Sequence, residues 1–385
     1  MAKPEIRLKG FEGEWKKHSL KEKEFTIIAG GDIDRSLIKD KGKYPVIANA
    51  LSNEGVVGYY DNYYRIKAPA VSVTGRGEIG YAKARKTSFT PVVRLLSIES
   101  FHDVDFLANA INCHKTIQES TGVPQLTTEK IAQYEIAFPK DIEEEKAIGY
   151  YILSIDTYIQ STTKKMKSLK QMKQACLVSM FPQAGETTPR VRFKGFEGEW
   201  NYLSMSDIFM ERHDISTIME RLPQLSFTIE EGVIRPEDRK TNKRDFLIKD
   251  KSNKKYLVTR LDDIIYNPAN VIYGAIHKNS LCDGVVSPIY KIFYTQQDPS
   301  FMECVVRRPE FIQEMTIYME GTVQKLRTLK PEAFLRMSAY IAPSLEEQKK
   351  IGNYFRTLDK QISLQEKRLE KLKQIKAACL DKMFV

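Results

Sequence analysis

The sequence predicts an α+β fold in which two mixed α/β domains alternate with two long helices. Two internal repeats predict this arrangement. The segments PEIRLKGFEGEW (4–15) and PRVRFKGFEGEW (189–200) agree at nine of twelve positions. Residues 143–181 align without gaps to residues 346–384, with 18 of 39 positions identical. A chain of 385 residues can form two domains with separate cores, so each half is expected to contain an opening motif, an unlike region and a helix.

The repeats also predict the boundaries of these parts. We expect a first domain, a first helix, a linker, a second domain and a second helix at 1–140, 141–182, 183–188, 189–341 and 342–385. The repeated hexapeptide GFEGEW is interpreted as structural rather than catalytic. Its glycines permit a turn, and its aromatic residues are expected to anchor the start of each domain: Phe11, Trp15, Phe196 and Trp200.

Both repeats at 143–181 and 346–384 are predicted to be helices with a heptad seam. Mostly apolar residues recur at alternating steps of four and three for more than four heptads, and neither segment contains proline. Acidic residues in PKDIEEE and PSLEEQ suit the positive end of a helix dipole. The predicted interface residues are Ile148, Ile152, Ile155, Ile159, Met166 and Leu169, with Ile351, Phe355, Leu358, Ile362, Leu369 and Leu372.

Each seam needs a partner, and the other helix is the partner we expect. Burial of each Ile or Leu stabilises by about 1.5–3 kcal/mol. The alternative is that each helix packs only on its own domain. About 33 helical residues span on the order of 50 Å, which is longer than a small domain is wide and favours a mutual coiled coil. Cys176 and Cys379 fall at equivalent seam positions, so they are interpreted as small buried apolar residues rather than a disulfide or metal site.

Composition favours a folded protein with an anionic partner. The chain is 42% hydrophobic and carries a formal net charge of +10. No signal-peptide core or membrane-length apolar run is present, and the five cysteines are scattered, so we expect a reduced cytoplasmic protein. Residues 235–255 hold nine basic and four acidic residues. Nucleic acid is the commonest partner of such a chain, although solubility alone would also explain the charge.

The two unlike regions, about 16–140 and 201–341, share an order of elements but few residues. β-rich runs are expected at 67–75, 92–98, 261–267 and 285–294. Helical stretches are expected at 103–119 and 299–319, each followed by a polar loop with glycine near its start. Equal scaffolds with unequal surfaces are typical of two recognition modules for two different targets.

No catalytic motif is convincing in this sequence. A GxxxxGK[ST] phosphate loop is absent. YNPANV (266–271) lacks the second proline and the aromatic residue of the adenine-methyltransferase motif and is interpreted as a loop. Glu144 and Lys146 begin a helix without the upstream Asp of a nuclease, and the five histidines show no triad or HExxH spacing. We therefore expect a non-enzyme without a metal or cofactor of its own.

Candidate DNA contacts lie on polar loops near the ends of predicted strands. Glycine allows the backbone to approach a phosphate, and Arg can bond to the major-groove edge of guanine with two donors. On the loop at 73–86 the candidates are Thr74, Arg76, Lys83, Arg85 and Lys86. In the second half they are Tyr266, Asn267, Asn270, Tyr273, Lys278, Gln324, Lys325 and Arg327, with Lys240, Lys243 and Arg244 in the basic stretch. Each alone could be an ordinary solvated residue, so the case depends on the set.

With these residues in view, the whole chain resembles the specificity subunit of Type I restriction-modification systems. The resemblance depends on the duplicated GFEGEW, on IEEEKAIG and LEEQKKIG at the starts of the long helices, and on the variable regions between them. Residues 262–290 also resemble a frequent segment of the family's target recognition domains. The resemblance implies two target recognition domains in a pseudo-two-fold arrangement. Each would read one half of a bipartite site in double-stranded DNA.

The resemblance further implies what surrounds the chain. The two helices would form an antiparallel coiled coil that sets the spacing of the half-sites and docks two methyltransferase subunits. Two ATP-dependent restriction subunits would join that core, unless the system only methylates. S-adenosylmethionine, ATP and Mg would then be bound by partner subunits. Two other hypotheses stay open: a fused nuclease-methyltransferase, which the missing motifs oppose, and a coiled-coil scaffold without DNA readout, which the basic stretches oppose.

Overall fold

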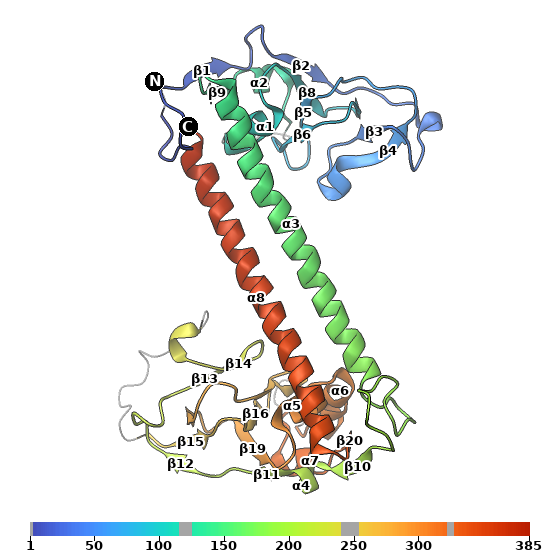
Figure 1. Cartoon of the computed structure of the whole chain (residues 1–385), viewed down its shortest axis with the longest axis vertical. Helices are drawn as coiled ribbons and strands as arrows, with labels where there is room; N and C mark the ends of the chain where they lie inside the picture. Colours follow the sequence, from blue (N-terminus) through green and yellow to red (C-terminus); the bar gives the residue numbers. More distant parts are fainter. Residues whose placement is uncertain (1–2, 115–124, 240–253, 322–326) are drawn as a thin grey trace. The chain divides into compact units, whose positions relative to one another are not determined.

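The structure, a computed structural model, describes residues 3–114, 125–239, 254–321 and 327–385. It divides into two compact units (Figure 1). Unit 1 comprises residues 1–164 with 366–385, and unit 2 comprises residues 165–365. Each unit contains strands, short helices and part of both long helices, so the predicted mixed class is confirmed.

A four-stranded antiparallel sheet forms the centre of unit 1. Its order is β2–β8–β5–β6, formed by Thr26–Ala29, Leu96–Glu99, Ala70–Val73 and Ala82–Arg85. Strand β5 reads AVSV and is buried at every position, as expected for a strand covered on both faces. A second sheet has the order β4–β3–β7, formed by Val56–Tyr60, Tyr44–Ile47 and Thr90–Pro91. Strand β1 (Lys16–Ser19) pairs with β9 (Glu135–Phe138) in a separate antiparallel ribbon.

Helix α1 (Val104–Cys113) packs on the main sheet of unit 1. Its apolar residues Phe106, Leu107 and Ile111 recur at helical spacing and are buried in one cluster with the sheet. Asp103 caps the helix by accepting from the N–H of Phe106 at 2.8 Å. The five-residue helix α2 (Thr128–Ala132) leads into β9.

Unit 2 repeats this sheet order with other residues. Its four-stranded sheet has the order β11–β19–β16–β17, formed by Phe209–Glu211, Lys291–Thr295, Ile264–Tyr266 and Ile276–Lys278. Strand β10 (Asn201–Ser204) pairs with β20 (Ser338–Ile341), as β1 pairs with β9. Two further sheets have the orders β12–β15–β18 and β13–β14, formed by Ile215–Ser216, Tyr256–Thr259, Gly284–Val286, Ser226–Thr228 and Gly232–Ile234.

Two predicted elements of unit 2 are divided in the structure. The run at 285–294, expected as one strand, supplies β18 and β19, which belong to different sheets. Pro288 lies between them, and proline cannot donate a ladder hydrogen bond. The stretch at 299–319, expected as one helical run, forms α5 (Pro299–Val306) and α6 (Pro309–Tyr318). Pro309 begins α6 because its ring is tolerated in a first turn but not in a helix interior. The short helices α4 (Met205–Ile208) and α7 (Pro331–Leu335) complete the unit.

The long helices are α3 (Ile142–Ser179) and α8 (Leu345–Met383). In unit 1 they run antiparallel, because Ile148 shares a cluster with Met383 while Asp156, later in α3, bonds to Lys376, earlier in α8, at 2.6 Å (Figure 1). The twelve residues predicted for the helix interface are all buried or half-buried.

In unit 2 the later part of α3 pairs with the earlier part of α8, whereas in unit 1 the earlier part of α3 pairs with the later part of α8. Lys173 of α3 bonds to Asp359 of α8 at 2.5 Å, and Cys176 Sγ lies 3.3 Å from the Tyr354 hydroxyl. Leu169 and Ile362 belong to the core cluster of this unit.

Candidate nucleic-acid interface

A polar loop joins β5 to β6 in unit 1 and carries the first candidate DNA contacts. Thr74 is buried and closes the loop: its N–H donates to the Tyr81 carbonyl at 3.0 Å, and its carbonyl accepts from Gly80 at 2.8 Å. Gly75 must lack a side chain, because a Cβ there would lie 2.2 Å from the carbonyl oxygen of Arg94. These contacts fix the base of the loop. Arg76 is exposed beyond it and forms no ion pair with any residue that the structure describes.

Three further candidates lie on or beside β6 rather than in the loop, where we expected them. Lys83 pairs with Glu54 at 2.6 Å, and Lys86 pairs with Asp105 at 2.7 Å. Arg85 donates to the Ser72 hydroxyl at 2.8 Å and to the Glu54 carbonyl at 2.9 Å, and burial lowers its pKa. The β-hairpin is longer than the sequence suggested, because small and long side chains alternate along β6 and allow it to pair fully with β5.

Lys83 and Arg85 line a shallow cavity of about 50 Å³ that Tyr81 also borders. Tyr81 is 42% exposed, so this part of unit 1 combines an accessible aromatic ring with basic side chains. The guanidinium and ammonium groups can donate to phosphate oxygens. The ion pair with Glu54 is exposed enough that a phosphate could replace the carboxylate at small cost.

The matching loop of unit 2 joins β16 to β17 and presents Tyr273. Asn267 holds the loop: its N–H donates to Ala275 at 2.9 Å, and its Oδ1 accepts from Ala269 at 3.1 Å. The Asn270 carbonyl accepts from Tyr273 at 3.0 Å. Tyr273, the last residue of the 3-10 turn Val271–Tyr273, is 67% exposed. The loop therefore presents an aromatic ring beside Asn side chains, which can pair with an adenine edge.

Two candidates in unit 2 have structural roles instead. Tyr266 is fully buried, and its hydroxyl donates to the Leu329 carbonyl at 3.1 Å. It ends β16, an interior strand of the four-stranded sheet, and burial raises its pKa. Lys278 has a side chain that is 7% exposed and pairs with Asp262 at 2.6 Å. Neither residue offers a free polar group to DNA, so both leave the candidate interface.

Arg327 also forms its hydrogen bonds within the protein. Its guanidinium donates to the carbonyls of Thr316 and Met319 at 3.1 and 2.8 Å, at the C-terminal end of α6. A cation is favoured at that end of a helix, where carbonyl groups lack helical partners. The remaining candidates lie outside the described residues: Lys240, Lys243, Arg244, Gln324 and Lys325.

The opening motif of unit 1 is fastened to α3 by an ion pair that the sequence reading missed. Arg7 bonds to Glu144 with two donors, at 2.7 Å from Nε and 2.6 Å from Nη2. The Glu144 side chain is 1% exposed, and its hydrogen bond raises the pKa of Arg7. Arg7 also donates to the carbonyls of Glu12 and Gly13 within GFEGEW. The hexapeptide thus forms one side of a clamp that holds the start of α3.

Unit 2 contains the same clamp. Arg192 donates to Glu347 at 2.6 and 2.8 Å, and to the carbonyl of Gly198 at 2.6 Å. A signal was present in the sequence, because both the Arg and the Glu are identical between the repeats. Trp15 and Trp200 are buried as predicted, and Gly13 and Gly198 have positive φ angles of 91° and 83°. The structural interpretation of GFEGEW is therefore supported by the contacts that surround it.

Residues 12–171 match the family model described as Type I restriction modification DNA specificity domain. This match covers less than half of the chain and agrees with the resemblance seen in the sequence. A curated protein of Mycoplasma pneumoniae, named as a type I specificity subunit, is 28% identical over 151 residues. That match covers 37% of this chain and 41% of the relative, so it spans less than half of either protein.

A solved structure also has a fold similar to this one. The crystal structure of the Type I restriction-modification system S subunit from M. genitalium covers 100% of this chain, and 99% of that chain is matched. The TM-score is 0.65 at 16% sequence identity, so the likeness concerns the fold. Among the described parts of the chain, no helix is long and apolar enough to cross a membrane.

Proposed function

We propose that this chain is a specificity subunit that reads a bipartite site in double-stranded DNA, one half with each unit. The observation that carries the proposal is the pairing of equal frames with unequal loops. Both units have the same sheet order, the same Arg–Glu clamp and the same aromatic anchor. The loop after β5 presents Arg76, whereas the loop after β16 presents Tyr273. Two different side-chain sets on one frame suit two different half-sites.

The proposed contacts are the exposed and half-buried members of the candidate set. Arg76, Lys86 and Tyr273 are exposed, and Lys83, Arg85, Asn267 and Asn270 are half-buried. Arg76 is the strongest of these, because its guanidinium is exposed and forms no ion pair within the described residues. We assign base readout to Arg76 and the Asn residues, and phosphate contacts to Lys83 and Lys86.

The long helices are proposed to set the distance between half-sites and to dock two methyltransferase subunits, with or without two restriction subunits. A helix of 38 residues is about 57 Å long at 1.5 Å per residue. That length suits half-sites separated by about 10–15 bp, or one turn of DNA. Both units expose apolar helix residues on which a partner could pack: Tyr150, Leu153 and Tyr158 in unit 1, and Met172 and Leu364 in unit 2.

The catalytic steps are assigned to partner subunits. S-adenosylmethionine would be bound by the methyltransferase, and ATP with Mg by the restriction subunits. The exposed groups proposed for DNA contact here are donors and an aromatic ring, which suit binding rather than bond cleavage. Methylation of DNA by the purified chain alone would contradict this assignment.

Methylome sequencing tests the proposal directly. The full chain is expressed with the methyltransferase subunit of its own system in cells that lack other methyltransferases. We expect a bipartite methylated motif that disappears when this chain is omitted. Arg76→Ala should relax or weaken recognition at one half-site by about 1–3 kcal/mol, and Tyr273→Ala should affect only the other half. Lys9→Ala removes an exposed charge from the opening motif and serves as the control.

The outcome also distinguishes a protein that recognises a DNA sequence from a coiled-coil scaffold that does not bind DNA. If Arg76→Ala and Tyr273→Ala leave the methylated motif unchanged, these loops do not read bases. Binding of duplex DNA by the full chain should weaken steeply as salt rises, because bound phosphates release counterions. A chain that shows no salt-dependent binding to DNA would favour the scaffold hypothesis.

A further inference from the structure

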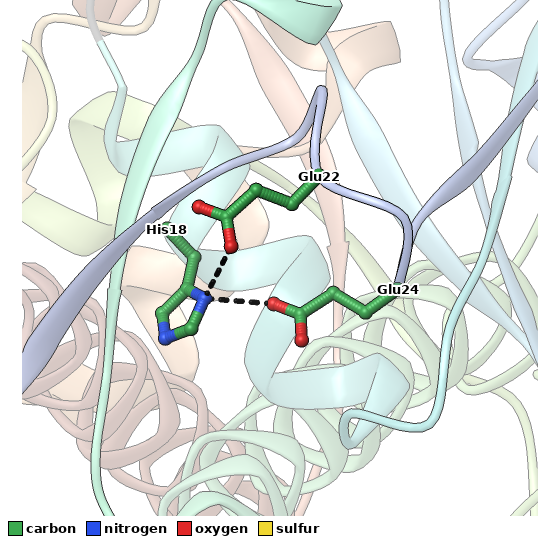
Figure 2. A group of neighbouring side chains, drawn as sticks. All are labelled: His18, Glu22 and Glu24. Atoms are coloured by element: carbon green, nitrogen blue, oxygen red, sulfur yellow. Dashed lines mark hydrogen bonds and ion pairs between the residues drawn. The ribbon is translucent and has the colours of Figure 1, made fainter.

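Three side chains of unit 1 bring potential metal ligands together beside β1 (Figure 2). His18 Nδ1 lies 2.8 Å from Glu24 Oε1 and 3.1 Å from Glu22 Oε2. The ligand atoms of His18, Glu22 and Glu24 all lie within 4.8 Å of one another. A single imidazole N–H cannot donate well to two carboxylates at once. The cluster therefore concentrates negative charge around one ring nitrogen.

The local fold places these groups before any ligand binds. His18 is on β1, and two tight turns follow, in which Glu22 donates to the Ser19 carbonyl at 2.9 Å and Phe25 to the Glu22 carbonyl at 3.1 Å. Ser19 also donates to Glu22 Oε1 at 2.9 Å, which leaves Oε2 directed at His18.

A fourth group faces the same cluster from the segment before α1. The side chain of His102 is 6% exposed, and its Nε2 lies 3.7 Å from Glu24 Oε1. Both of these atoms are buried, and neither makes a hydrogen bond of normal geometry within the described residues. The other ring nitrogen of His102, Nδ1, lies 2.9 Å from Glu145 Oε1. If Nδ1–H donates to Glu145, the lone pair of Nε2 faces a carboxylate oxygen, and either a metal ion or a second ring proton would offset the repulsion between them.

Aromatic rings hold His102 in this orientation. Phe138 stacks on the imidazole with centroids 3.9 Å apart, and Phe101 stacks at 4.2 Å. A carboxylate on the second ring nitrogen and a fixed ring plane are the usual surroundings of a metal-ligating histidine. The imidazole of His102 is thereby kept from water, whereas the Glu22 and Glu24 side chains remain 48% and 22% exposed.

We propose that His18 Nδ1, His102 Nε2, Glu24 and Glu22 bind one divalent transition-metal ion of the Zn²⁺ class. Tetrahedral Zn²⁺ with ligands at 2.0–2.2 Å separates its ligand atoms by about 3.3–3.6 Å. The separations of 2.8 and 3.1 Å from His18 Nδ1 and of 3.7 Å between His102 Nε2 and Glu24 lie around that value. His102 is outside the group whose ligand atoms are all within 4.8 Å of one another, so its ring would shift toward the other ligands when the ion binds. Two imidazoles favour Zn²⁺ over Mg²⁺ or Ca²⁺, which prefer oxygen ligands.

The metal would join three elements of unit 1. Glu22 and Glu24 come from the turn after β1, His102 precedes α1, and Glu145 fixes His102 from the first turn of α3. A bound ion would therefore fasten the recognition domain to the helix, beyond the DNA-reading role proposed above. Unit 2 provides an internal contrast, because Leu203 and Gln297 stand where unit 1 has His18 and His102.

Calorimetric titration of the chelator-treated full chain with Zn²⁺ tests the site. We expect about one Zn²⁺ per chain and a higher Tm in its presence. Glu24→Gln and His102→Gln should each weaken binding at least about 10-fold, and Glu145→Gln should weaken it by about 10–100-fold through loss of the orienting carboxylate. His213→Ala is the control, because His213 is exposed and has a single carboxylate neighbour, Glu211, within the described residues at 3.7 Å.

Circular dichroism establishes that each variant is folded, and Glu24→Gln preserves side-chain shape if His102→Gln proves unstable. Zn²⁺ binding that none of these variants weakens would overturn the proposal, as would the absence of binding at micromolar Zn²⁺. A third result would also overturn it: no metal binding, but a pH-dependent Tm that these variants abolish. In that case a proton on His102, rather than a metal, balances the carboxylates.

Discussion

Trp15 in unit 1 meets Phe106 edge-on with ring centroids 5.6 Å apart, and Trp200 in unit 2 meets Phe301 in the same way at 5.6 Å. The agreement is local. Elsewhere in the units, the loop that presents Arg76 in unit 1 is replaced in unit 2 by a loop that presents Tyr273. The two units are therefore most alike where a domain joins the helices and least alike in their exposed loops. A frame that must hold a domain on a helix tolerates little change, whereas loops proposed to read two different targets are expected to differ.

The same comparison shows that one contact can be made with different chemistry. In unit 1 the N–H of Asp103 donates to Glu145 at 3.0 Å, and in unit 2 the N–H of Asp298 donates to Gln348 at 3.0 Å. Glu145 also meets His102, an ionisable partner, whereas Gln348 meets the neutral Gln297 at 2.8 Å. The backbone contact is retained while the ionisable Glu145–His102 pair is replaced by the neutral Gln348–Gln297 pair in unit 2.

The largest effect is expected from breaking the clamp in one unit only. Arg7→Ala leaves Glu144, which is 1% exposed, as an unpaired buried carboxylate. The loss of one partner from a buried ion pair costs about 3–5 kcal/mol. Hydrogen exchange measured by mass spectrometry should show faster exchange in peptides of unit 1, with unit 2 unchanged.

Arg192→Ala is the matched variant and should give the converse pattern, because Glu347 is equally buried. Arg7→Lys retains the charge but cannot form both hydrogen bonds to the carboxylate, so its effect should be smaller. An equal increase of hydrogen exchange in both units after either substitution would show that the units do not unfold independently. That result would contradict their description as two separate frames.

The next effect distinguishes two equivalent seam residues. Leu169 is 8% exposed and lies in the core cluster of unit 2, whereas Leu372 is only half-buried in unit 1. Leu169→Ala should therefore cost about 2–3 kcal/mol and Leu372→Ala about 1 kcal/mol. Hydrogen exchange in the helix peptides of each unit measures the difference. Equal costs would mean that the unlike burial of the two residues has no energetic consequence.

Charged substitutions at the same positions test the proposed docking role. Leu169→Asp or Leu372→Asp should prevent assembly with the methyltransferase subunits while each recognition domain remains folded, because an unpaired carboxylate on the seam disrupts the helix pair. Size-exclusion chromatography with light scattering measures the stoichiometry. Normal assembly of both variants would contradict the role assigned to the helices.

A smaller effect is expected at the glycines of the long helices. In an exposed helix, Gly→Ala stabilises by about 1 kcal/mol. At Gly149 a Cβ would lie 2.4 Å from Asp103 Oδ1, and at Gly352 it would lie 2.5 Å from Asp298 Oδ1. Asp103 caps α1, which lies against Gly149, and Asp298 caps α5, which lies against Gly352. Gly149→Ala and Gly352→Ala should therefore destabilise their units by about 1–3 kcal/mol. Asn353→Ala, at an exposed position of α8, should not.

These glycines illustrate which features the sequence predicted and which it did not. The repeats predicted the two-fold order of elements, the long helices and the buried Trp15 and Trp200, because periodicity and identity are properties of the chain itself. They did not predict that Gly149 accommodates the cap of α1, since that contact joins segments distant in sequence. For the candidate site, residue type selected both Arg76, which is exposed, and Tyr266, which is buried in the sheet. Whether a polar residue faces water depends on its strand's place in the sheet.

The smallest effect is expected from moving the chain ends, which tests how completely the two frames correspond. In unit 1 the N–H of Ile6 donates to the Lys382 carbonyl at 3.0 Å, and in unit 2 the N–H of Val191 donates to Ser179 at 2.8 Å. The opening motif thus lies against the end of a long helix in both units, although the chain is continuous only in unit 2 (Figure 1). A short linker that joins Val385 to Met1 should therefore be tolerated.

The matching permutant joins those ends and opens the chain near Ala184, which is exposed in the segment between α3 and the second opening motif. Because every contact of both frames is retained, we expect its Tm, its assembly with the methyltransferase subunits and its methylated motif to match those of the parent chain. A control permutant opened near Thr163 would cut α3 and should lose assembly, since a helix interior cannot be interrupted without loss of backbone hydrogen bonds. If the first permutant folds but fails to assemble, the covalent link between α3 and the second domain has a role that the first domain and α8 do not share, and the two frames are not equivalent.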